Sequence, residues 1–228
     1  MIVYGKQIML HLLEHCPQRI EEIYLAKEID KKLFSSFLKI GAKILRIDSK
    51  KAQAMARGGN HQGFLAKITP LEPVSKKEIL LLPTLLVLCG ISDVGNIGSI
   101  FRSAYSLGVD GIIIGGNLGA NAIEGSIRTS SAAMLSMPFF LTPHPLELIH
   151  EIKERGKICY GADMGGEEIS SITPAKEWAL FLGAEGEGLS GKIKQKMDKI
   201  ISIEMKNSFN SLNVGVATGI LIHRLKNG

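Results

Sequence analysis

The region from Gly183 to Asn213 most constrains what this 228-residue chain can fold into. It opens with the glycine loop, Gly183-Ala184-Glu185-Gly186-Glu187-Gly188-Leu189, passes through the short apolar run 200–203, and closes on the serine loop, Asn210-Ser211-Leu212-Asn213. Each loop adjoins a predicted buried strand or the start of a helix. Because small residues allow a ligand to approach bare backbone, the sequence predicts a ligand pocket between these two loops.

The apolar pattern from Leu85 onward predicts an α/β domain with a mostly parallel sheet. Leu85 to Cys89 is a continuous apolar run, which is typical of a strand covered on both faces. The expected strands are 85–89, 111–114, 139–141, 158–161, 178–182 and 200–203. The expected helices are one that ends at Leu107 before Gly108, then 121–134, 145–155, 190–197 and 211–225.

The first 68 residues predict a smaller α/β domain with its own core. The expected helices are 3–15, one capped by Asp30 and ended by Gly41, and one from Ser49, as its cap, to Met55; the expected strands are 23–26, 44–47 and 64–68. Three prolines and a charged run make 69–84 a linker with room for one helical turn. The predicted division is therefore 1–68, 69–84 and 85–228.

Charge is distributed unevenly between these parts. Residues 1–84 hold 14 Lys and Arg against 8 Asp and Glu, a balance of +6, whereas residues 85–228 hold 13 against 14, a balance of −1. A basic N-terminal third is typical either of a part that attracts a polyanion or of a solvated lysine-rich surface.

Composition limits the class of protein. We expect a soluble, cytoplasmic protein, because no signal-peptide pattern opens the sequence and the longest apolar runs fall far short of the roughly 20 residues that span a bilayer. The three separated cysteines, Cys16, Cys89 and Cys159, form no CxxC pair, so we expect buried, reduced thiols and neither a metal site nor a disulfide framework.

Asn96, Gly98 and Arg102 form the first polar constellation. Asn96 falls where a strand gives way to a helix, so it is placed to cap that helix and to face a ligand. Arg102 lies four residues after Gly98, and the missing side chain there leaves room for the guanidinium to reach the loop mouth. An arginine at the carboxyl edge of a parallel sheet suits a phosphate, but an ordinary surface arginine has the same spacing.

The chemistry of the two loops excludes the common nucleotide motifs. The glycine spacing is G-x-x-G-x-G, not G-x-G-x-x-G, and no Gly-Lys-Ser/Thr follows. Glu185 and Glu187 favour a cationic or neutral ligand over a phosphate, and S-adenosylmethionine fits that description. Ser211 and Asn213 bring a hydroxyl and an amide to the start of a helix, where they either serve a site or only cap the helix.

These segments together resemble the SpoU/TrmH family of RNA 2′-O-ribose methyltransferases. The resemblance rests on three ordered motifs, Asn96-x-Gly98-x-x-x-Arg102, Leu182 to Leu189, and Ile201 to Met205 continuing through Ser211 to Val214. The basic N-terminal part, with Asn60-His61-Gln62-Gly63, is similar to the substrate-binding domain of the branch that methylates a guanosine of 23S rRNA. The resemblance therefore covers the whole chain.

The resemblance implies a fold, a cofactor and site residues. The implied fold is a C-terminal SPOUT α/β domain with a deep trefoil knot, preceded by an L30e-like domain, and the implied assembly is a homodimer through the C-terminal domain, with each site completed by the partner. The implied cofactor is S-adenosylmethionine without a metal, and the implied substrate is RNA. The implied cofactor-binding residues are Gly183, Ile203, Met205 and Leu212, and the implied catalytic residues are Asn96, Arg102, Glu185, Ser211 and Asn213.

Two positions depart from the family pattern. Glu204 stands where proline is usual, and Ala133 stands where glycine is common. The first departure favours a competing hypothesis, an RNA-binding assembly factor that kept the fold without the chemistry. Methylation of tRNA is a second alternative, although the tRNA branch usually lacks the N-terminal domain.

Overall fold

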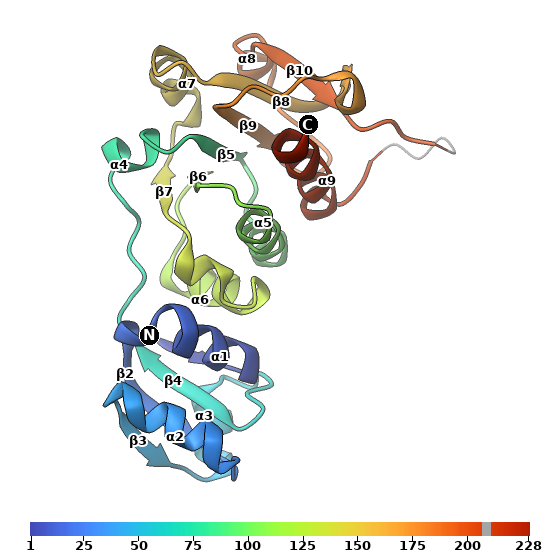
Figure 1. The fold of residues 1–228 in the computed structure, drawn as a ribbon. Coiled ribbons are helices and arrows are strands. Elements are labelled where there is room, and N and C mark those ends of the chain that lie inside the picture. The colour runs from blue at the N-terminus through green and yellow to red at the C-terminus, as the bar shows by residue number, and fades with distance from the viewer. Residues whose placement is uncertain (207–210) are drawn as a thin grey trace.

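Two sheets organise the chain, which the computed structural model describes over residues 1–206 and 211–228 (Figure 1). The N-terminal elements are β1 (Ile2–Tyr4), α1 (Lys6–His15), η1 (Pro17–Arg19), β2 (Ile20–Leu25), α2 (Lys31–Ile40), β3 (Lys43–Arg46), α3 (Ser49–Met55) and β4 (Phe64–Ile68). After α4 (Lys76–Leu80) follow β5 (Thr84–Cys89), α5 (Val94–Ser106), β6 (Gly111–Gly115), α6 (Ala120–Thr129), η2 (Ala133–Ser136), β7 (Phe139–Thr142), α7 (Pro145–Glu154), β8 (Ile158–Glu168), η3 (Ile169–Ser171), β9 (Trp178–Gly183), α8 (Gly191–Lys194), β10 (Lys199–Ser202) and α9 (Val214–Asn227).

The smaller sheet has the order β1-β4-β2-β3, with β2 and β3 parallel and the other pairs antiparallel. Its core includes Leu12, Ile23 and Phe37, all fully buried. The α2 prediction is confirmed at both ends: the Asp30 carboxylate accepts a hydrogen bond from the Leu33 N–H at 2.8 Å, and Gly41 takes the left-handed conformation, φ 77°.

Two N-terminal predictions were wrong in detail. The helix expected from residue 3 begins only at Lys6, because Ile2–Tyr4 pairs with β4 as a strand and Gly5 turns the chain at φ 111°. Asp48, not Ser49, caps α3: its carboxylate accepts from the Lys51 N–H at 2.7 Å. The backbone of Asp48 is extended, as that of a helix cap usually is. The sequence alone did not distinguish Asp48 from Ser49 as the cap.

The larger sheet is parallel throughout, with the order β10-β8-β9-β5-β6-β7. Leu86 and Leu88 of β5 pack with residues of α5 and α9, whereas Leu85 and Val87 pack on the other face with residues of α4 and α7. Both faces of the sheet are thus buried, and the predicted α/β fold with a mostly parallel sheet is confirmed. The trefoil knot stays a prediction.

Four element boundaries differ from the expected ones by three residues or more in the C-terminal part. The helix expected over 190–197 ends at Lys194. The helix expected over 121–134 ends at Thr129, because Ser131 and Ala132 have left-handed φ values of 53° and 75°. The strand expected over 158–161 continues to Glu168, and its pairing with β10 jumps from Gly161 to Glu167. The last helix begins at Val214 instead of Ser211, because Asn213 is its cap.

The N-terminal unit contacts the larger one through α1 and β1, which lie against η2 and α6 (Figure 1). His11 Nε2 lies 2.7 Å from the Ser136 hydroxyl, and the Cys16 thiol donates to the Leu135 carbonyl at 3.7 Å. At the other end of α6, Arg57 Nη1 lies 2.8 Å from Asn121 Oδ1. These contacts hold the basic unit next to the helices that follow the central strands.

All three cysteines are free and buried, as predicted. Burial raises the pKa of Cys89 and that of Cys159 to about 12, so both thiols stay protonated near neutral pH and are poor nucleophiles.

Among the described helices, none is both long and apolar enough to cross a membrane.

Candidate active site

A cavity of about 600 Å³ lies at the carboxyl end of β9, between the glycine loop, the end of β10 and the start of α9. The structure brings seven predicted site residues to its wall: Gly183, Glu185, Ile203, Met205, Ser211, Leu212 and Asn213. Asn96 and Arg102 are not part of the wall. Asn210, which the sequence analysis placed in the serine loop, lies outside the described residues.

The glycine loop is folded back on itself. The Gly188 N–H donates to the Ala184 carbonyl at 2.9 Å, and Gly186 and Gly188 adopt left-handed φ values of 81° and 67°. A Cβ on Gly183 would lie 2.0 Å from the Gly188 carbonyl carbon, so only glycine fits at the end of β9. The close approach of Gly188 therefore leaves no room for a side chain at the end of β9, where the cavity begins.

Asn213 joins all three motifs through one side chain. Its Nδ2 donates to Asn96 Oδ1 at 2.8 Å and to Glu185 Oε1 at 3.0 Å. Its Oδ1 accepts from the N–H groups of Gly215 and Val216 at 3.0 and 3.4 Å, which caps α9. The cap and the site contact, which the sequence left as alternatives, thus belong to the same residue.

Asn96 was predicted to be able to cap α5, and this was wrong. The cap is Asp93, whose carboxylate accepts from the Asn96 N–H at 2.8 Å, and Asn96 is the third residue of the helix. The Asn96 side chain does not cap the helix. Its amide oxygen instead accepts a hydrogen bond from Asn213 Nδ2.

The space at Gly98 is filled by α6 and does not accommodate Arg102. A Cβ at Gly98 would lie 1.9 Å from the Thr129 hydroxyl oxygen, so the glycine allows α5 and α6 to pack closely. Arg102 is exposed and lies six residues beyond Asn96, about 9 Å along the helix axis. The prediction that Gly98 lets its guanidinium reach the loop mouth was therefore wrong.

A bulge in β8 supplies cavity residues that the sequence reasoning missed. The register jump leaves residues 162–166 outside the pairing with β10, and Ala162, Asp163 and Met164 line the cavity. The Asp163 carboxylate pairs with Lys194 Nζ at 2.5 Å. The pair Gly165-Gly166, which lies beyond the strand expected over 158–161, was the available signal of an irregular strand there.

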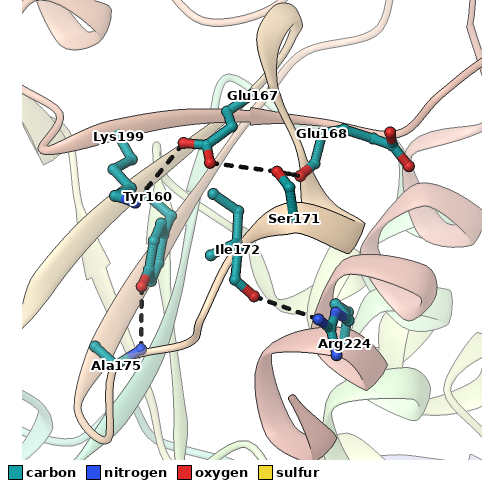
Figure 2. A network of polar contacts seen from close by, with 8 residues as sticks. All are labelled: Tyr160, Glu167, Glu168, Ser171, Ile172, Ala175, Lys199 and Arg224. Atoms are coloured by element: carbon teal, nitrogen blue, oxygen red, sulfur yellow. Dashed lines mark hydrogen bonds and ion pairs between the residues drawn. The ribbon is translucent and has the colours of Figure 1, made fainter.

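The segment after this bulge is bonded to the C-terminal helix, as Figure 2 shows. Arg224 of α9 donates through Nη2 to the carbonyls of Ser170 and Ile172 at 3.0 and 3.4 Å. On the other side of the segment, Lys199 Nζ pairs with Glu167 at 3.7 Å. These contacts fix α9, and with it the Asn213 end of that helix, relative to β8 and β10.

Both acidic and aliphatic residues line the cavity. The acidic ones are Asp163, which is paired with Lys194, Glu185 and Glu187, and the aliphatic ones include Leu182, Ile203, Leu212, Val214 and Leu221. Within residues 1–206 and 211–228, no three His, Cys, Asp or Glu side chains are grouped as a metal site requires. Glu204 is exposed and is not part of the cavity wall, although its neighbours Ile203 and Met205 are.

The fold and the cavity first define a class. A parallel sheet whose carboxyl edge carries small-residue loops around a cavity is typical of α/β proteins that bind a nucleotide-like ligand. The model of the SpoU rRNA Methylase family matches residues 83–223, and a model described as RNA 2′-O ribose methyltransferase substrate binding matches residues 2–74. The chain therefore belongs to the SpoU rRNA methylase family, and it is an RNA methyltransferase.

Individual relatives agree with this assignment. The chain is 30% identical to the 23S rRNA (guanosine-2′-O-)-methyltransferase RlmB of Photorhabdus laumondii, over 97% of this chain and 95% of that protein. The fold is similar to the AdoMet-bound SpoU methyltransferase AviRb of Streptomyces viridochromogenes, with a TM-score of 0.81 and 21% identity over 100% of this chain and 89% of AviRb. The TrmH/SpoU tRNA modifying enzyme of A. aeolicus matches 66% of this chain and 79% of its own, with a TM-score of 0.57 and 22% identity.

Proposed function

We propose that the protein transfers a methyl group from S-adenosylmethionine to a ribose 2′-hydroxyl of RNA, and that the target is a guanosine of 23S rRNA in the cytoplasm. The observation that carries this proposal is the side chain of Asn213, a residue of the cavity wall, which bonds Asn96 and Glu185. One side chain thus links three sequence motifs that lie up to 117 residues apart.

The cavity fits the proposed methyl donor in size and in charge. Its volume of about 600 Å³ lies within the usual range of small-molecule sites. Glu185 and Glu187 attract the positively charged sulfonium and ammonium groups of S-adenosylmethionine, and the aliphatic wall suits its adenine. We assign the cofactor to Gly183, Ile203, Met205 and Leu212, with the folded glycine loop presenting main-chain groups to it.

The bound cofactor would supply an electrophilic methyl group, so the chain itself needs only to hold and orient the RNA. We assign that part to Arg102, whose fork of donors suits a phosphate and the 2′-oxygen. An arginine stays protonated at physiological pH, so it stabilises developing negative charge on the oxygen and does not accept the proton, which passes to the phosphate or to water. Asn96, Ser211 and Asn213 position these groups.

The position of Arg102 supports a homodimer in which each cavity is completed by the partner. In its own chain Arg102 lies outside the cavity wall. The helix α9, which packs against α5, has an apolar face, where Val216 and Ile220 are 53% and 41% exposed. Because these side chains lie one turn apart on the helix that begins at the cavity, we place the dimer contact there.

The extent of the similarity favours rRNA over tRNA. The full-length relative with an rRNA substrate in its name matches both parts of this chain, whereas the tRNA modifying enzyme matches two thirds of it. The non-catalytic alternative rested on Glu204, and the exposed position of this side chain outside the cavity wall removes its main support.

Two measurements test the proposal. Isothermal titration should give stoichiometric binding of S-adenosylmethionine to the full chain, which a non-catalytic assembly factor need not show. Tritiated methyl transfer should label 23S rRNA taken from cells that lack the gene, and the label should map to one ribose. Cofactor binding without label in rRNA, but with label in tRNA, would transfer the proposal to tRNA.

A further inference from the structure

Three aromatic rings meet on the surface where the two units of the chain join, and we name them the ring cluster: His11 and His15 of α1 and Tyr105 of α5. The two imidazole centroids are 4.6 Å apart, and the Tyr105 ring lies 5.7 Å from His11 and 6.4 Å from His15, edge-on to both. Tyr105 is 38% exposed, and the His15 side chain is 40% exposed. The cluster therefore presents ring surface to solvent.

The cluster lies directly beside Arg102. Tyr105 follows Arg102 by three residues in α5, so the two side chains are neighbours on the helix surface. The histidines come from the basic N-terminal unit, and the bond between His11 Nε2 and the Ser136 hydroxyl, at 2.7 Å, holds them against the larger unit. The rings therefore lie between the basic unit, which supplies the two histidines, and Arg102, which precedes Tyr105 on α5.

The rings suit a nucleobase better than a phosphate. Burial, and after it the neighbouring His15, lower the pKa of His11, so this imidazole is neutral near pH 7. The Glu14 carboxylate lies 3.7 Å from His15 Nε2 and would repel a phosphate at this point. Exposed aromatic rings are the usual platform for an unpaired base.

We propose that the ring cluster stacks an unpaired nucleobase next to the ribose that Arg102 presents. The inference rests on the proposed function, since it takes RNA as the ligand. It adds a positioning role for Tyr105, His11 and His15. These rings would hold the base next to the target nucleotide outside the cavity, while the ribose of the target nucleotide enters the cavity.

The test uses the full chain and a single-stranded RNA of about 15 nucleotides that carries one 2-aminopurine, whose fluorescence reports stacking. Tyr105→Ala should weaken RNA binding about tenfold and reduce the fluorescence change, because one base–ring contact is lost. Tyr105→Phe should bind within about twofold of wild type, because the ring remains. Leu81→Ala removes a side chain that is 61% exposed outside the cluster and serves as the matched control.

Separate readouts distinguish this inference from the proposed function. If Tyr105→Ala fails to fold, by circular dichroism, His15→Ala takes its place, with an expected loss of about threefold in RNA affinity. Wild-type affinity in the variants without a ring, an equal loss in Tyr105→Phe, or no RNA binding by the wild type would overturn the inference. Ring-dependent RNA binding in a protein that transfers no methyl group would instead overturn the proposed function alone.

Discussion

The two sheets of this protein differ in which of their residues are exposed to solvent. The edge strand β3 of the smaller sheet has no fully buried residue, and it carries Lys43 and Arg46 on the surface. In the larger sheet all six residues of the central strand β5 are buried, and side chains pack on both faces of this strand. A sheet with charged, open strands offers a broad surface to a polyanion, whereas a covered parallel sheet offers a ligand only its carboxyl edge.

This difference is consistent with the proposed function, which assigns the two substrates to different parts of the chain. In that proposal the small ligand binds in the cavity at the end of β9, and the RNA binds on the basic unit and along α5. Only the groups around Asn213 need to serve both ligands. Variants in one part should therefore change the binding of one ligand and leave that of the other unchanged.

The largest expected effect is that of Arg102→Ala, which should reduce methyl transfer about 1,000-fold or more. The guanidinium would stabilise charge that develops only during transfer, and it lies outside the cavity wall, so the affinity for S-adenosylmethionine should stay within about twofold of wild type. Single-turnover transfer of tritiated methyl and titration calorimetry measure the two quantities. Arg102→Lys keeps the charge without the fork, and it should recover only a small part of the rate. Substantial turnover in the alanine variant would refute the assignment.

Gly183→Ala tests the proposed cofactor site, as Arg102→Ala tests the proposed role in RNA binding and transfer. The new methyl group would lie 2.0 Å from the Gly188 backbone, so the glycine loop has to open. Such overpacking costs about 1–3 kcal/mol, and we expect cofactor affinity to fall about 10- to 100-fold while RNA binding stays near wild type. Gly191→Ala is the matched control, since a Cβ there meets nothing within 4 Å and the backbone is not left-handed. A Gly183→Ala protein that binds the cofactor normally would show that the loop does not form the site.

A smaller effect is expected when charge is removed from the basic unit. Lys50→Gln with Lys51→Gln changes two exposed side chains on α3, and it should weaken RNA binding about tenfold at low salt. If both lysines contact phosphates, the slope of log Kd against log salt should fall by about 2. Lys192→Gln with Lys196→Gln makes the same charge change on the larger unit, next to α8. Equal losses in the two double variants would mean that the N-terminal unit has no special part in RNA binding.

Local sequence signals predicted much of the fold and part of the site. Continuous apolar runs located the buried strands, and Asp30 and Gly41 marked both ends of α2, because each of these signals is local. The glycine and serine loops were predicted to form one pocket, and the structure places both on the wall of one cavity.

Features that depend on distant partners could not be predicted in the same way. Gly98 was expected to make room for Arg102, but its space is taken by Thr129, which lies 31 positions later in the chain. The contribution of Asp163 depends on a register jump between β8 and β10, which only the paired strands define. The double use of Asn213 follows from bonds to residues 28 and 117 positions away.

The smallest expected effect concerns η2, the turn through which the larger unit contacts α1. Ala132 and Ala133 are both buried, at 0% and 4% exposure, but only Ala132 has a left-handed backbone, φ 75°. Replacing either alanine by glycine loses a buried methyl group and adds freedom to the unfolded chain, whereas only Ala132→Gly relieves left-handed strain. The free energy of unfolding of Ala132→Gly should therefore exceed that of Ala133→Gly by about 1 kcal/mol, measured by urea denaturation of both variants. Because Ser136 in the same turn bonds His11, equal destabilisation by the two substitutions would mean that contacts with α1, and not the strain at residue 132, set the stability of this junction.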